Sequence, residues 1–236
     1  MVTSKEEERM DHSPVESIPV WLGKTEEGKD EVMDLGRTPG VMVYAPEDSD
    51  FMEYLVHCAW GVDATNMALL IGARFSRFDG NPQSLWTSDL DLYDAFTAID
   101  YVNEREIPSR RDAILSTRSR DCVEYQKKTG NVMARLLVVV DEFLWLWEAD
   151  RSRFERQIRH LVLDGRMCGI HIVLRTSRIT VESFSHALRA VIPSCIILDV
   201  PTRMGDEALL YSERWWGEPV KLRMEHGLRQ LLQPTA

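Results

Sequence analysis

The chain has 236 residues, a hydrophobic share of 44% and a formal net charge of −10, which suit one sizeable α/β domain and argue against a broadly basic nucleic-acid-binding protein. No apolar run is long enough to span a bilayer, and the polar N-terminus has no apolar signal core, so we expect a cytoplasmic protein without direct membrane insertion. Four widely spaced cysteines and six scattered histidines predict reduced thiols and no metal site.

Charge is distributed unevenly along the chain. Residues 1–100 contain 20 acidic and 7 basic residues, whereas residues 101–236 contain 18 acidic and 21 basic residues, nearly all of them arginine. Arginine suits bidentate contacts with phosphate or carboxylate, although most surface arginines are only solvated. DNA is therefore a candidate partner of the second half, while the acidic first half would repel it.

The pattern of apolar residues predicts alternating strands and helices after a disordered leader at 1–17. Strands are expected at 18–22, 32–35, 40–44, 67–71, 136–140, 170–174 and 195–200, the first two forming a hairpin. Helices are expected at 51–60, at 90–104 with Ser88 or Asp89 as its cap, at 109–127, before Asp164-Gly165, and at 181–190. Apolar strands that alternate with amphipathic helices indicate a parallel sheet with right-handed crossovers.

Two acids follow the clearest strand of the chain. The run at 136–140 is wholly apolar, as in a central strand covered on both faces, and Asp141 and Glu142 come directly after it. Ligands of open α/β sheets bind at the carboxyl ends of the strands. There, one acid can orient magnesium through water and the other can polarise an attacking water. Alone, the pattern also fits a buried strand whose next residues reach solvent.

The sequence around this acid pair resembles that of the FtsK/SpoIIIE family. From Asp141 onward the sequence is DEFLWLWEADRSRFERQIRHLVLDGRMCGIHIVLRTSR, where the family has D-E-F, a helix, G-R-x-x-G-I-H-L-V-L and T-Q-R. IPVWLGK at 18–24, the paired Arg110 and Arg111, and HALRAVIPSCIILDV at 186–200 resemble further family segments. The resemblance runs from about residue 18 to residue 210.

The resemblance implies a fold and a domain division. We expect a RecA-like P-loop NTPase core at 18–210, with a central, mostly parallel sheet flanked by helices and a small N-terminal β hairpin. Residues 211–236 would pack on this domain or extend from it. Trp215 and Trp216 in that segment could anchor a partner or cap the core.

The phosphate-binding loop of the family is missing from the matching stretch. The positions of its glycines, lysine and hydroxyl residue are taken by Ala45, Asp48, Asp50, Phe51 and Met52. With Glu47, the two aspartates put three negative charges where the family holds a triphosphate. We therefore expect that ATP and magnesium are not bound, that Asp141 and Glu142 are vestigial, and that the loop acids satisfy the amides of the next helix instead.

The family's sensor and trans arginines also have counterparts. Where the family has T-Q-R, this chain has Thr176, Ser177 and Arg178. The glutamine that would sense the γ-phosphate is thus replaced by the shorter Ser177. Because ring ATPases place an arginine near the phosphates of the next subunit, Arg166, Arg178 and Arg203 are candidates for such contacts, or else surface residues. The acid pair could then serve only to hold Arg178 or a neighbouring subunit.

Three functions follow from this resemblance. The first is a non-hydrolysing pseudo-ATPase in a DNA translocation, conjugation or secretion complex, with homologous ATPase subunits or other components as partners and recruitment to a membrane complex left open. The second is a non-catalytic interaction module of a type VII secretion-like assembly. The third is an active translocase with an unrecognised phosphate loop, for which Gly23-Lys24-Thr25 is the candidate segment. This segment lacks the strand–loop–helix context that a phosphate loop requires.

Overall fold

The structure is a computed structural model that describes residues 17–63, 65–86, 92–178, 186–192, 194–198, 207–211 and 220–223. Nearly all of the expected leader, the caps Ser88 and Asp89, the first half of the expected helix at 181–190, Arg203 and the Trp215–Trp216 pair lie outside these residues.

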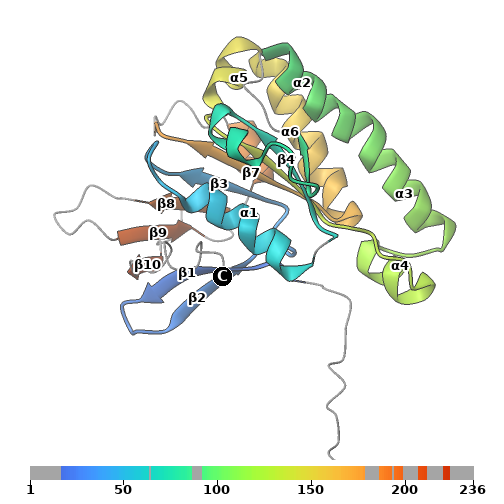
Figure 1. The fold of residues 1–236 in the computed structure, drawn as a ribbon, viewed down its shortest axis with the longest axis horizontal. Coiled ribbons are helices and arrows are strands. Elements are labelled where there is room, and N and C mark those ends of the chain that lie inside the picture. Colours follow the sequence, from blue (N-terminus) through green and yellow to red (C-terminus); the bar gives the residue numbers. More distant parts are fainter. Residues whose placement is uncertain are drawn as a thin grey trace, which may run out of the picture.

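The described residues build one mixed sheet in the order β2-β1-β10-β9-β8-β3-β7-β6-β4-β5 (Figure 1). Six neighbouring strands run parallel: β8 (Ser194–Leu198), β3 (Gly40–Tyr44), β7 (Ile170–Thr176), β6 (Leu136–Val140), β4 (Met67–Ile71) and β5 (Ser84–Trp86). Four antiparallel strands extend the β8 edge: β9 (Glu207–Tyr211), β10 (Val220–Arg223), β1 (Pro19–Thr25) and β2 (Asp30–Asp34). The predicted fold class, including the N-terminal hairpin β1–β2, is confirmed.

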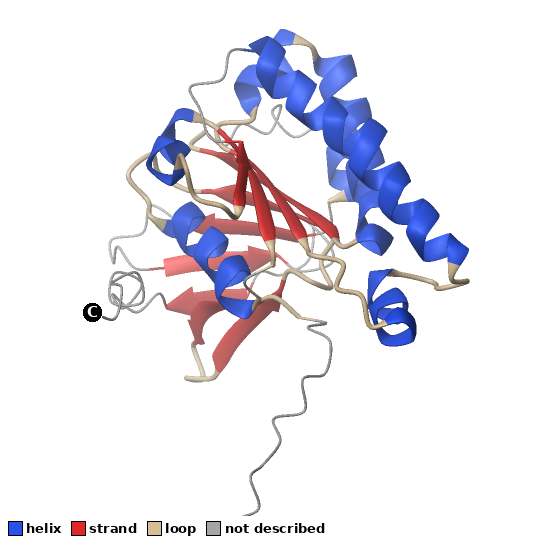
Figure 2. Ribbon diagram, turned by 45° about the vertical axis from the view of Figure 1, so that its right-hand side comes forward, coloured by secondary structure: helices blue, strands red, loops and turns tan. Residues whose placement is uncertain are grey.

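Helices cover both faces of the parallel strands, which explains why these strands are apolar throughout (Figure 2). On one face, Leu137 and Val139 pack with α1 (Phe51–Val62) and the short η1 (Ala73–Phe78). On the other face, Val138 and Val140 pack with a larger helical layer. That layer contains α2 (Leu92–Tyr101), η2 (Val102–Glu106), α3 (Ile107–Ser116), α5 (Leu144–Ala149), α6 (Arg151–Gly165), η3 (Arg166–Cys168) and α7 (His186–Val191).

The helical boundaries differ from the prediction in one region. α2 continues through the π-helical η2 into α3, so that one long rod replaces two separate helices. The expected helix at 109–127 breaks after Ser116, where Arg118 has a positive φ of 56°, and restarts as α4 (Cys122–Thr129). Asp121 causes the restart, because its side chain accepts the N–H of Glu124 as an N-cap. The sequence analysis also did not predict β5, because a strand of three residues within a polar loop is too short to show an apolar periodicity.

No helix among the described residues is long and apolar enough to cross a membrane.

Candidate functional site at the carboxyl edge of the sheet

The site is built where the central strand β6 ends. The N–H of Asp141 donates to the carbonyl of Ile71 at 2.8 Å, so the residue continues the ladder to β4 and its side chain stays largely buried. Gly72 follows β4 with φ +139°, and a Cβ added there would lie 2.7 Å from the Cβ of Asp141. A glycine is therefore required for the chain after β4 to pass this close to the carboxylate.

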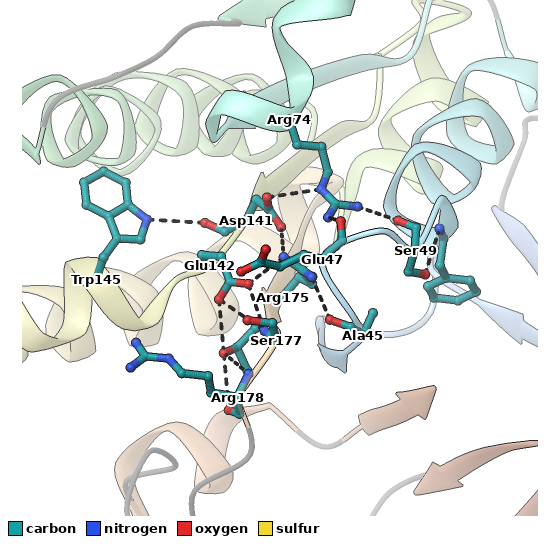
Figure 3. A network of polar contacts seen from close by, with 12 residues as sticks. Ala45, Glu47, Ser49, Arg74, Asp141, Glu142, Trp145, Arg175, Ser177 and Arg178 are labelled. Atoms are coloured by element: carbon teal, nitrogen blue, oxygen red, sulfur yellow. Dashed lines mark hydrogen bonds and ion pairs between the residues drawn. The ribbon is translucent and has the colours of Figure 1, made fainter. Parts of the chain in front are cut away.

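Arg175 on β7 binds both acids. The register pairs Val140 with Leu174, which brings Arg175 beside Asp141. Its guanidinium donates through Nη1 to Asp141 Oδ1 at 2.9 Å and to Glu142 Oε1 at 2.7 Å, and through Nη2 to the carbonyl of Ala45 at 2.7 Å (Figure 3). Arg175 is only 1% exposed, so this cation depends on its carboxylate partners.

A second arginine reaches the same carboxylate from η1. Arg74 Nε donates to Asp141 Oδ2 at 3.2 Å, while its Nη atoms donate to the carbonyls of Ser49 and Glu47 (Figure 3). Its Nη1 also lies 3.8 Å from the buried carboxylate of Glu53, which Arg77 contacts as well. Both oxygens of Asp141 are thus bound to arginine, and the charges of three acids and three arginines balance.

Glu142 is turned toward the end of β7. Its backbone is left-handed, with φ +48°, a conformation that costs free energy in a residue other than glycine. Its two carboxylate oxygens accept the N–H of Ser177 at 3.0 and 3.1 Å, and Oε2 also accepts the hydroxyl of Thr176 at 3.4 Å. Together with Arg175, these contacts hold the carboxylate against β7.

The segment between β3 and α1 packs differently from the expectation. Phe51 and Met52, which match the lysine and hydroxyl positions of the phosphate loop, are buried in the core. Glu47, Asp48 and Asp50 are exposed, and Asp50 makes no capping hydrogen bond. The expected capping by these acids is therefore wrong: the hydroxyl of Ser49 accepts the N–H of Phe51 at 3.3 Å, while the three carboxylates are exposed to water.

The remaining candidates lie apart from the acid pair. Arg178 pairs with Glu148 at 3.5 Å, both side chains being exposed, so the acids hold Arg175 rather than Arg178. The register between β6 and β7 explains this, because it places Arg175, three residues before Arg178, beside Asp141. Arg166 is exposed at the opposite edge of the sheet, before β7 begins.

Sequence reasoning missed Arg175, Arg74 and Gly72. Arg175 had a usable signal: it is a lone cation in the apolar run IHIVLRT, and such a residue needs a carboxylate partner on a neighbouring strand. Arg74 and Gly72 had none, because the partner of Arg74 is 67 residues away and its other acceptors are backbone carbonyls.

Comparisons with known proteins find relatives in sequence and in fold. No family model matches the chain. The DNA translocase FtsK of Treponema pallidum is 26% identical over 221 residues, covering 82% of this chain and 26% of that protein. The DNA translocase SftA of Bacillus subtilis is 25% identical over 153 residues, covering 56% of this chain and 16% of that protein. The chain thus spans about a quarter or less of the length of these relatives.

Solved structures share the fold. The pCW3 conjugation coupling protein TcpA, in its monomer form with ATPγS, superposes with a TM-score of 0.71 and 16% identity over 88% of this chain and 65% of that chain. The cytoplasmic domain of the type VII secretion ATPase EccC of Thermomonospora curvata gives a TM-score of 0.70 and 16% identity over 94% of this chain and 32% of that chain.

The fold of the chain is thus the P-loop NTPase fold that these solved ATPase structures share. In sequence, the chain is similar to proteins named as FtsK-type DNA translocases, as its motifs predicted.

Proposed function

We propose that the chain is a non-hydrolysing FtsK/SpoIIIE-like subunit or domain of a translocation, conjugation or secretion complex, which acts through structural or regulatory contacts. One observation carries this proposal: Arg175 and Arg74 bind the acid pair that would serve magnesium and water in an active relative.

The residues present do not fit a magnesium–nucleotide complex. Magnesium is held by carboxylate and water oxygens, and at Asp141 it would have to compete with two guanidinium groups, because each carboxylate oxygen already accepts an arginine. The loop between β3 and α1 turns the carbonyls of Ala45, Glu47 and Ser49 toward arginines, and carbonyls cannot donate to phosphate. Its exposed acids would also repel a triphosphate.

Relatives suggest the kind of complex. Conjugation and type VII secretion ATPases share the fold, and DNA translocases share the motifs. Homologous ATPase subunits are therefore the partners we propose, with DNA as a further candidate and a cytoplasmic site of action near such a complex. A non-catalytic module of a type VII secretion-like assembly satisfies the same observations, because it too requires only the fold and its surface.

The structure speaks against an active translocase that uses Gly23-Lys24-Thr25. These residues end strand β1 and pair with β2 and β10, and Lys24 Nζ contacts Asp30 Oδ1 at 3.0 Å. A phosphate loop needs a strand, a loop and a helix in succession, and this segment lies in a β hairpin.

ATP hydrolysis by the purified chain tests the proposal. We expect the wild-type rate to equal that of a Glu142→Gln variant, because Glu142 would polarise no water in the arginine-bound site. FtsK of Treponema pallidum provides the positive control. Hydrolysis that Glu142→Gln abolishes would show an active site and overturn the proposal.

A further inference from the structure

Arg74 joins three segments of the chain at the carboxyl edge of the sheet. Its side chain, 13% exposed, leaves η1 and donates to Asp141 Oδ2 at the end of β6 and to the carbonyls of Glu47 and Ser49 in the β3–α1 loop (Figure 3). Its Nη1 also lies 3.8 Å from Oε2 of Glu53 on α1. These four oxygens, from two backbone carbonyls and two carboxylates, form an oxygen cage around the guanidinium.

One oxygen of the cage accepts no hydrogen bond. Glu53 is only 4% exposed, and its Oε1 contacts Arg77, whereas its Oε2 is buried without a hydrogen-bond donor. A buried carboxylate oxygen without a donor is costly, so the nearby charge of Arg74 is what compensates it. The cage therefore has capacity for a cation beyond the hydrogen bonds that Arg74 makes.

The oxygen cage has the chemistry of a site for a hard cation. Calcium binds carboxylate and backbone carbonyl oxygens in flexible geometries, and the cage offers both kinds. Three arginines already balance the three acids of this site, so the native chain needs no metal there. The guanidinium of Arg74 thus occupies the place that a metal ion would take among these oxygens.

Arg74 also fastens the β3–α1 loop. Within the described chain, it donates every hydrogen bond that links residues 47–49 to a residue beyond the start of α1. The other hydrogen bonds of these residues are local: the N–H of Ser49 donates to the carbonyl of Pro46 at 3.1 Å, and its hydroxyl accepts the N–H of Phe51 at 3.3 Å. Because the loop carries three exposed acids and lies beside the acid pair, a cation is needed to hold it there.

We propose that Arg74 is a built-in cation that takes the place of a metal ion and fastens the β3–α1 loop to the end of β6. The oxygen cage is a latent divalent-cation site, which binds calcium once the guanidinium is removed. Because the cation is part of the chain, the loop keeps one position whatever nucleotide is present, and the surface that it offers to a partner subunit stays constant. This inference rests on the proposed function, in which the acid pair takes no magnesium–nucleotide.

Thermal unfolding in EDTA and in calcium chloride tests the inference with three variants. Arg74→Ala vacates the cage, Arg77→Ala removes an equal charge from the same acids but leaves the cage filled, and Arg74→Lys keeps a cation in it. With calcium about tenfold above the midpoint of its titration, we expect the unfolding temperature of Arg74→Ala to rise by about 3 °C or more. The wild type, Arg77→Ala and Arg74→Lys should shift by less than about 1 °C at the same calcium concentration.

Hydrogen exchange at the amides of residues 47–50 gives a local measurement. We expect Arg74→Ala to exchange faster than the wild type in EDTA and to slow when calcium is added, because two oxygens of the cage belong to this loop. An Arg74→Ala chain that is unfolded in EDTA and folds in calcium would support the inference as well. Calcium that leaves Arg74→Ala unchanged or unfolded, or that stabilises Arg77→Ala equally, would overturn it.

These measurements contain no nucleotide, so their failure is distinguishable from failure of the proposed function. ATP hydrolysis by the wild type that Glu142→Gln abolishes would count against the proposed function, whatever calcium does to Arg74→Ala. A calcium-insensitive Arg74→Ala variant, together with a wild type that hydrolyses no ATP, would overturn the built-in cation alone.

Discussion

Arg175 carries a full charge into the interior at the point where β6 and β7 end. A buried guanidinium of this kind is tolerated because Asp141, Glu142 and the carbonyl of Ala45 all accept from it. The two carboxylates in turn need the arginine, since Asp141 is only 8% exposed. Removing one partner from this site should therefore cost more stability than removing one partner of an exposed ion pair.

Replacing Arg175 tests this dependence. Arg175→Met keeps much of the volume but leaves two acids without their shared partner, and we expect a loss on the order of 3 kcal/mol in the free energy of unfolding, measured with urea. Arg178→Met removes an exposed pair and should change it by less than about 0.5 kcal/mol. Equal losses in the two variants would show that the buried network contributes nothing.

His171 gives the fold a pH dependence. Burial, and then the charge of Arg135, lower its pKa from 6.5 to about 4 in the folded chain. The unfolded chain binds this proton first as the pH falls, so stability is retained above pH 6.5 and decreases between about 6.5 and 4. From this group we expect a loss of about 2 kcal/mol between about pH 7.5 and pH 5.

His171→Asn removes the titration while retaining an amide that can donate to the carbonyl of Thr38, the acceptor 3.1 Å from the ring nitrogen. Urea unfolding across this range should therefore give a shallower pH dependence for the variant. Parallel curves for wild type and variant would contradict the assignment.

At the scale of elements, the turn from β4 into η1 positions Arg74 against the acid pair. Gly72→Ala would force a Cβ to within 2.7 Å of the Cβ of Asp141 at a φ of +139°, so we expect a loss on the order of 2 kcal/mol or more. Gly61→Ala is the matched control, because its Cβ would meet no atom within 4 Å and it lies in α1, where alanine stabilises a helix by up to about 1 kcal/mol. Thermal unfolding that shifts equally for both variants would refute the close approach.

The elements differ in how readily sequence reveals them. The strands at 40–44, 67–71 and 136–140 were predictable because burial on both faces demands continuous apolar runs. The break between α3 and α4 was not, because one left-handed residue and one capping aspartate decide it within an otherwise polar stretch. The acid pair was predictable from its place after the central strand, whereas its arginine partners depend on register between segments distant in sequence.

At the scale of the whole molecule, the sheet separates two charged regions. The carboxyl edge holds acids neutralised by arginines, and the amino edge holds a cavity whose lining includes five cationic and two anionic residues. In an open α/β fold the carboxyl edge is the usual ligand site. In this chain that edge is occupied by its own side chains, which is the physical reason to propose contacts rather than hydrolysis as its contribution.

Calorimetric titration of the chain with magnesium–ATP tests this central claim most directly. Comparison of the wild type with Asp141→Asn separates heat at the acid pair from heat at any other site. The account predicts no heat of binding at the acid pair, because Arg74 and Arg175 already bind its oxygens. A micromolar dissociation constant for magnesium–ATP in the wild type that disappears in Asp141→Asn would contradict it.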